Sequence, residues 1–222
     1  RITPTAGARN IFGVERIVME CEPQTADPDT AGEQLLDEPD LVVLNAIFLK
    51  KMATTADIAG LLGLEEKDLL SLLERAALAG LIMTTDSGHL LLPKGTEVIH
   101  RHYDKTYAAL RENPMLGPWY ERFEVINSRF IEALTNWQKM KGEDLLFKAL
   151  DIVERLCGEL TELAVLVPRY AGYQRRFETA LQVIEAGDLD LLCNPRRDSA
   201  HNIWFEFHED ILCVLGRPRD TT

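Results

Sequence analysis

Cationic and aromatic side chains alternate near residue 170, and this combination is suited to binding an anion. Arg169 and Tyr173 are four positions apart and Arg169 and Arg176 are seven apart, so all three share one face of a helix. Guanidinium groups bind carboxylates and phosphates through paired hydrogen bonds. We therefore expect a polar, aromatic pocket for a small anionic effector. Its predicted lining is Asn127, Trp137, Arg169, Tyr173, Arg176 and His201.

The same arginines have a simpler interpretation. Arg169 and Arg176 can pair with acidic residues of neighbouring helices, because a guanidinium that is removed from water needs a charged partner. The candidate partners are Glu162, Glu178 and Glu206. The spacing alone leaves both interpretations open.

The histidines of the last predicted helix do not have the spacing of a metal site. His201 and His208 are seven positions apart, whereas two zinc-binding histidines on one helix are usually four apart. We therefore expect core histidines that hydrogen-bond across helices. The chain also lacks a glycine-rich phosphate loop and the G-x-S-x-G, H-E-x-x-H and C-x-x-C motifs. The expectation is a protein with no metal, no cofactor and no enzymatic activity.

A second group of side chains has the chemistry to contact DNA. Lys67, Ser71 and Arg75 are four positions apart and lie on one side of a predicted helix. The first turn of that helix contains Glu65 and Glu66, which stabilise a helix N-terminus but repel phosphates. The full set of predicted DNA-contacting residues is Thr55, Lys67, Ser71, Arg75, Lys94 and Arg101.

The last two of these residues belong to a local basic cluster that has an alternative interpretation. The cluster is Lys94, His100, Arg101, His102 and Lys105. It could contact phosphates beside a groove. It could equally be a solvated helix face whose cations pair with Glu97 and Asp104 at ordinary helical spacing.

The elements that position the predicted DNA contacts are encoded in residues 41–102. Apolar residues at helical spacing predict one helix from Leu41, a short one over residues 56–62 and a third that Gly80 ends. Two short apolar runs flank the turn sequence Asp86-Ser87-Gly88, which predicts a hairpin. Pro93 then suits the first turn of a fourth helix. Helix, short helix, turn, longer helix and hairpin is the order of a winged helix-turn-helix.

In this region the chain resembles winged-helix regulators of the multiple-antibiotic-resistance repressor (MarR) type. The matching residues are Thr55-Ala56-Asp57-Ile58-Ala59 with Leu64, Leu73-Glu74 to Gly80-Leu81-Ile82, and Gly88-His89-Leu90 with Leu92, Pro93, Lys94 and Gly95. The resemblance implies a winged helix that binds double-stranded DNA. Because such proteins read two half-sites, it also implies a homodimer.

The remainder of the chain predicts a helical bundle. Apolar spacing indicates helices over residues 119–140, from residue 144, from Pro168 to Gly187 and over residues 199–215, with breaks at Asn113-Pro114 and Gly117-Pro118. The segments FEVINSRFIEALTNWQ, PRYAGYQRRFETALQVIEAGD and HNIWFEFHEDILCVLGRPR resemble the helical tail of an uncharacterised group of actinobacterial proteins. In that group the tail accompanies a winged helix, and some members are labelled as phosphoenolpyruvate-utilising or dikinase-related.

Composition limits the classes of protein to which the chain can belong. The 222 residues are 46% hydrophobic and carry a net charge of −12, which is unusual for a nucleic-acid binder. No apolar run approaches the roughly 20 residues of a membrane-spanning helix, so no membrane association is expected. The spacing of the cysteines predicts reduced thiols in a cytoplasmic protein. These cysteines are Cys21, Cys157, Cys193 and Cys213.

The predicted organisation is mainly α-helical, in three parts. Residues 1–36 are expected to form an N-terminal arm or linker, with one strand or short helix over residues 11–21. Residues 37–111 are expected to form the winged helix-turn-helix domain, and residues 112–222 the helical bundle. The first residue is Arg1 and not Met, so we expect the chain to be a processed or excised piece.

Two functions follow from this organisation. The leading one is a DNA-binding transcription regulator that is modulated through its C-terminal helical domain. The alternative is a regulatory or protein-interaction module that does not bind DNA, such as the C-terminal part of a phosphoenolpyruvate-utilising or dikinase-related enzyme. A continuous positive face over the third helix and the hairpin favours the first function, and an acidic third helix favours the second.

Overall fold

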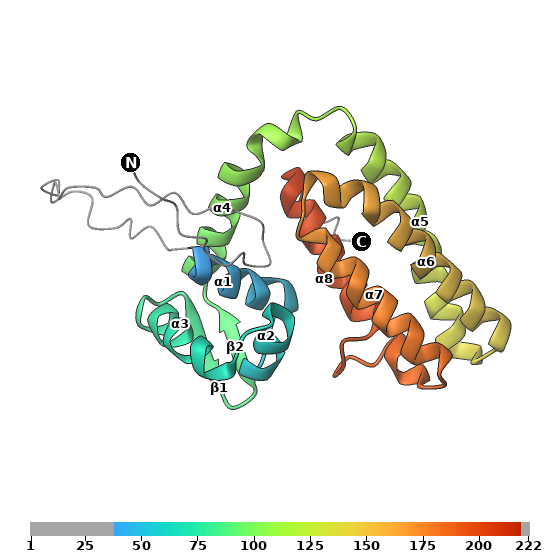
Figure 1. Ribbon diagram of the computed structural model, residues 1–222, viewed down its shortest axis with the longest axis horizontal. Coiled ribbons are helices and arrows are strands. Elements are labelled where there is room, and N and C mark those ends of the chain that lie inside the picture. Colours follow the sequence, from blue (N-terminus) through green and yellow to red (C-terminus); the bar gives the residue numbers. More distant parts are fainter. Residues whose placement is uncertain (1–37, 219–222) are drawn as a thin grey trace, which may run out of the picture.

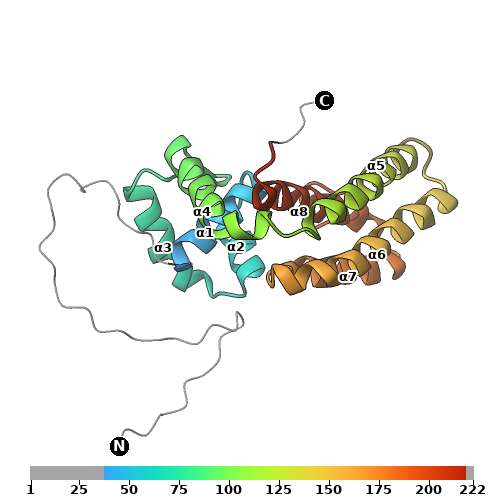
Figure 2. The ribbon, with the colours of Figure 1, turned by 90° about the horizontal axis from the view of Figure 1, so that it is seen from above.

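The computed structural model describes residues 38–218, and it is mainly α-helical. The predictions for the N-terminal arm or linker, including its strand or short helix, lie outside the described residues. Figure 1 shows the first three helices and a hairpin on one side, the long helices of the C-terminal half on the other, and α4 between them. In Figure 2 the pair α5 and α6 extends away from α1, α2 and α3.

The N-terminal half has the predicted order of elements. They are α1 (Glu38–Lys50), α2 (Thr55–Leu62), α3 (Glu66–Leu78), β1 (Ile82–Thr85), β2 (Gly88–Leu91) and α4 (Pro93–Arg111). Local chemistry explains most boundaries. The Thr54 hydroxyl accepts from the Asp57 backbone N–H while the Asp57 carboxylate accepts from the Thr54 N–H, which is a capping box at the start of α2. Gly63 ends α2 with a left-handed φ of 65°.

The hairpin is short and antiparallel. β1 pairs with β2 in a register that places Ile82 opposite Leu91 and Thr85 opposite Gly88. A further bridge joins Ala53, just before α2, to His89 in β2. The backbone N–H and carbonyl of His89 both bond to Ala53, so the hairpin is fixed to the segment between α1 and α2.

The C-terminal half contains four long helices and one short one. They are α5 (Leu116–Met140), α6 (Glu143–Leu166), α7 (Tyr170–Glu185), the 3-10 helix η2 (Leu189–Leu192) and α8 (Ala200–Leu215). The predicted break at Gly117-Pro118 is wrong, because both residues lie in the first turn of α5. Proline is tolerated there, since the first backbone N–H groups of a helix have no partner within it. The apolar spacing does not predict η2.

A single cluster of buried apolar side chains runs from α1 to α8. α8 is central to it, because this helix packs against α1 and α4 of the N-terminal half and against α7 of the C-terminal half. α5 packs on α6, and α6 packs on α7. The contacts of α8 therefore bring side chains from both halves together.

Candidate interaction surface and buried polar network

α3 presents an exposed face that contains few cations. Helical spacing places Lys67, Ser71, Glu74 and Leu78 on this face, opposite the buried Leu69, Leu73 and Ala76. The Leu78 side chain is 90% exposed. Lys67 and Ser71 can donate hydrogen bonds, whereas Glu74 is a carboxylate and Leu78 is an almost fully solvated leucine.

Arg75 lies at the edge of this face, and its side chain is bound to a residue of α1. Its guanidinium contacts the carboxylate of Asp40 in α1 at 2.6 Å, and Asp40 is buried. The predicted DNA donor therefore also fixes α3 against α1. Asp40 was not among the predicted functional residues, and no local pattern marks it, because its partner is 35 residues away.

The predicted contacts on the hairpin side also have partners within the protein. The Lys94 ammonium donates to the Ala79 carbonyl at 3.0 Å, close to the end of α3. Arg101 forms the ion pair with Glu97 that the alternative interpretation predicted, at 2.8 Å. The predicted partner Asp104 instead binds Arg111. The geometry of this cluster favours a solvated helix face.

Thr55, the remaining predicted DNA contact, takes part in a small polar cluster beneath the hairpin. The Thr55 hydroxyl lies 3.1 Å from Nε2 of His89, and the Thr84 hydroxyl lies 3.0 Å from Nδ1 of the same ring. His89 is 7% exposed, and this burial lowers its pKa below the ordinary value of 6.5. The neutral imidazole thus links α2 to both strands.

Acidic and apolar groups dominate the surroundings of the exposed α3 face. Glu65, Glu66 and Asp68 are exposed at the start of the helix. Leu70 is 53% exposed on α3. We call the exposed residues Lys67, Leu70, Ser71, Glu74 and Leu78, together with this acidic first turn, the α3 surface. A surface of this composition attracts cations and apolar side chains and repels phosphate.

Arg169 lies in a buried polar network instead of an open pocket. Its guanidinium binds the carboxylate of Asp210 in α8, including a contact of 3.2 Å from Nε to Oδ2, and also binds the Tyr107 hydroxyl in α4. The Asp210 side chain is 1% exposed. The Arg169 side chain is 26% exposed, but a carboxylate as far from water as that of Asp210 is stable only because it is paired and because further hydrogen bonds satisfy it.

Three tyrosines complete the network around Asp210. The hydroxyls of Tyr103 in α4, and of Tyr170 and Tyr173 in α7, donate to its carboxylate at 2.9, 3.3 and 3.2 Å. Burial, and next the charge of Asp210, raise the pKa of each of these tyrosines well above 10. The hydroxyls therefore remain protonated donors. Burial alone would lower the pKa of Arg169, but the charge of Asp210 raises it well above its ordinary value.

Arg176 takes part in a second ionic cluster. It binds Glu206 of α8 at 2.7 Å and Asp198 of the preceding loop, with 2.9 Å between its Nε and Asp198 Oδ2. Lys50 of α1 reaches the same Glu206 carboxylate at 2.9 Å. Glu206 was one of the predicted partners, so the salt-bridge interpretation of Arg176 is confirmed for that residue. Glu162 binds Arg122 instead, and Glu178 binds Gln174.

The structure places the six predicted effector-binding residues in different environments. Asn127 accepts a hydrogen bond from the indole of Trp204 at 2.9 Å inside the core. Trp137 is buried near the end of α5, where the Lys141 ammonium lies 3.7 Å from its ring centroid. His201 is exposed on α8. Since carboxylates already bind Arg169 and Arg176, the geometry favours structural ion pairs over an anion pocket.

The two histidines of α8 have different environments. Nε2 of His208 lies 3.3 Å from the Tyr120 hydroxyl and 3.2 Å from the Glu124 carboxylate, so its predicted contact across helices is confirmed. The prediction of a core position is wrong for His201, which points to solvent because it precedes the buried turn at Ile203 and Trp204. Within residues 38–218, no group of three histidine, cysteine or acidic side chains is arranged to hold a metal ion.

Comparison of the chain with protein-family models, with curated proteins and with solved structures finds no match. In the part of the chain that the structure describes, no helix combines the length and apolar character needed to cross a membrane.

Proposed function

We propose that this chain is a winged-helix protein-interaction module, and that its α3 surface binds a positively charged, partly apolar segment of a partner protein. The composition of the exposed α3 face carries the proposal. Glu65, Glu66 and Asp68 lie at the N-terminal end of α3, which is the end of a recognition helix that approaches base edges, and their carboxylates repel phosphate. Leu70 and Leu78 are 53% and 90% exposed and lie at helical spacing on the same side of α3, and an exposed apolar patch marks a protein-interaction site.

The ionic contacts of the α3 helix support the same function. Arg75, the strongest candidate for reading a guanine, is bound to the buried Asp40. A phosphate or base would have to compete with this carboxylate, whose burial makes it costly to leave unpaired. The net charge of −12 also favours a protein partner over DNA, because it attracts basic proteins and repels nucleic acids.

The second candidate is a DNA-binding regulator of the MarR type. The order of α1, α2, α3, the hairpin and α4 favours it, and Lys67 and Ser71 are exposed on neighbouring turns of α3. Such a protein would act as a homodimer on two half-sites. It would bind DNA with a strong dependence on salt, because cations such as Lys67 would displace counterions from phosphates.

The two functions are separated by fluorescence anisotropy with two labelled probes at low salt. One probe is an amphipathic helical peptide of lysine and leucine, and the other is a duplex of genomic DNA. We expect the peptide to bind, and Leu78→Ser to weaken its binding about tenfold, because burial of a leucine side chain contributes about 1.5–3 kcal/mol. The matched control is Met140→Ser, since Met140 is 67% exposed at the end of α5.

Equal weakening by Leu78→Ser and Met140→Ser would contradict the proposal, because the peptide would then be attracted only by the overall charge. DNA binding that Lys67→Ala weakens would favour the regulator. In that case Glu65→Gln with Glu66→Gln should tighten the complex, since two carboxylates near the phosphates would be neutralised.

A further inference from the structure

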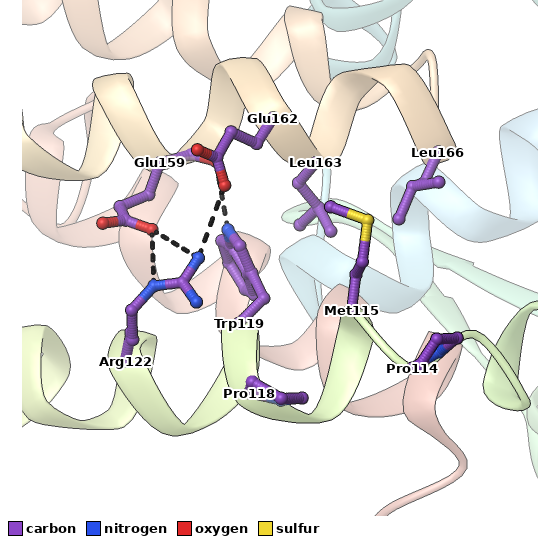
Figure 3. Close-up of a pocket in the computed structure, with 9 residues that line it drawn as sticks. All are labelled: Pro114, Met115, Pro118, Trp119, Arg122, Glu159, Glu162, Leu163 and Leu166. Atoms are coloured by element: carbon purple, nitrogen blue, oxygen red, sulfur yellow. Dashed lines mark hydrogen bonds and ion pairs between the residues drawn. The ribbon is translucent and has the colours of Figure 1, made fainter.

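A groove at the start of α5 lies outside the α3 surface and is not part of either polar network. Its volume is about 560 Å³, within the range typical of small-molecule sites. Figure 3 shows Met115 and Trp119 pointing from the α5 side toward α6, from which Leu163 and Leu166 point back. Its lining is therefore apolar over most of its length.

Proline and tryptophan side chains form the α5 wall of the groove. Pro114 precedes α5, where the Asn113 side chain accepts from the Met115 backbone N–H at 2.9 Å, and Pro118 lies in the first turn. Trp119 is 3% exposed, stacks on Phe123 and donates its indole N–H to the Glu159 carbonyl at 3.1 Å. These contacts fix the wall in place, so little order has to be gained when a ligand binds.

One end of the groove is polar and has an excess of negative charge. Arg122 contacts the Glu159 carboxylate at 3.2 Å and the Glu162 carboxylate at 3.4 Å. One guanidinium thus serves two carboxylates, which leaves a net charge of −1 at this end. The side chains of Arg122 and Glu162 are 47% and 62% exposed, and exposed pairs of this kind are weakly held.

The apolar wall and the acidic end together define the ligand. From this geometry we infer that the groove binds an amphipathic cation, a small molecule with an apolar body and one amino group. The apolar body lies against Met115, Leu163 and Leu166. The ammonium pairs with the carboxylate charge of Glu159 and Glu162 that Arg122 does not neutralise. Met115 is 59% exposed in the free protein, so a ligand covers apolar surface that is now in water.

Three ligands of the same length test the charge and the apolar body separately. Hexylammonium, hexanol and hexanoate are titrated into ¹⁵N-labelled protein, and the indole N–H signal of Trp119 is followed. The signals of Trp137 and Trp204 are internal references, because neither residue lines the groove. We expect saturable shifts at Trp119 that are tightest for hexylammonium, weaker for hexanol and weakest for hexanoate.

Two substitutions locate the binding site. Glu162→Gln should weaken hexylammonium binding about two- to fivefold, the size of a partly exposed ion pair, and leave hexanol unchanged. The matched control is Glu154→Gln, which removes an exposed carboxylate from the same helix outside the groove and should change nothing. Leu166→Gln should weaken all three ligands.

Equal affinity for hexylammonium and hexanoate would overturn the inference, and so would shifts at Trp119 that do not saturate. Hexylammonium binding that Glu162→Gln and Glu154→Gln weaken equally would also overturn it, because the ligand would then respond to the net charge of −12 alone. The result is independent of the α3 surface, since Leu78→Ser leaves the groove intact.

Discussion

At the scale of single residues, His89 joins the hairpin to the start of α2. The sequence places it after the hairpin turn, and the structure buries its ring between the hydroxyls of Thr55 and Thr84. Because burial lowers its pKa, the folded protein favours the neutral ring. The unfolded chain, with a pKa near 6.5, therefore takes up a proton first as the pH falls.

We expect His89 to make the free energy of unfolding depend on pH. Its contribution is fully present above about pH 6.5 and is lost as the pH falls toward and through the lowered folded-state pKa. Urea unfolding at pH 7.5 and pH 5 measures the change. The free energy of unfolding should fall more between pH 7.5 and pH 5 in the native protein than in His89→Gln, because glutamine cannot be protonated. The difference between the two proteins should be about 1.4 kcal/mol for each unit by which burial lowers the His89 pKa.

The matched control is His100→Gln, since His100 is exposed on α4. It should show the same loss of stability as the native protein between the two pH values. Identical pH dependence of the native protein and His89→Gln would show that His89 does not sense the change.

At the scale of elements, the start of α4 depends on the absence of a side chain. Gly95 lies in the first turn of α4, and a Cβ atom built there overlaps the Leu81 carbonyl oxygen and lies 2.9 Å from the Leu91 side chain. The Leu81 carbonyl also accepts from the Leu92 backbone N–H at 2.9 Å, so it cannot move away freely. The hairpin and α4 can pack this closely only because residue 95 is glycine.

Substitution of two helical glycines should therefore have opposite effects. Gly95→Ala should lower the free energy of unfolding by about 1–3 kcal/mol through overpacking. Gly60→Ala should raise it by about 0.5–1 kcal/mol, because Gly60 lies within α2 and a Cβ there meets no atom within 4 Å. Thermal and urea unfolding of both variants measure the difference. A stabilising Gly95→Ala would mean that the two elements are packed less closely than described.

At the scale of the whole molecule, the network around Asp210 joins the two halves. The network contains Tyr173 of α7 and Arg169 just before that helix, Tyr103 and Tyr107 of α4, and Asp210 of α8. A second contact across the same boundary comes from Arg111 of α4, whose guanidinium donates to the Val214 carbonyl at the end of α8. These contacts fix α4 to the bundle, so the α3 surface has a defined position relative to α8.

Removal of Arg169 should destabilise the entire chain. Arg169→Met leaves the buried Asp210 carboxylate without its cation, and breaking a buried pair costs about 3–5 kcal/mol. Urea unfolding followed by circular dichroism measures this loss. The control is Arg197→Met, because the Arg197 and Asp188 side chains are 40% and 42% exposed and such a pair contributes about 0–1 kcal/mol.

The result also distinguishes the two interpretations of Arg169. If the residue served mainly to anchor an effector, Arg169→Met would leave the stability of the unliganded protein unchanged. A loss below about 1 kcal/mol would therefore contradict the structural role of the pair.

The sequence by itself determined the helices, the hairpin and most of their boundaries. The signals for these are local: the Thr54 cap, the left-handed Gly63 and the apolar spacing all act within a few residues. The sequence also indicated the acidic start of α3. The helical period of that segment also places Leu70 and Leu78 away from its buried stripe, which is a local signal for the apolar part of the α3 surface.

Tertiary structure alone decided which charges meet. Asp40 binds Arg75 across 35 residues and Asp210 binds Arg169 across 41, and neither spacing has a periodic signature. The reason is that a charge is satisfied by whichever partner the packing of apolar faces brings within reach, and that packing involves the whole chain. The groove of Figure 3 arises in the same way, because its walls come from the start of α5 and the end of α6.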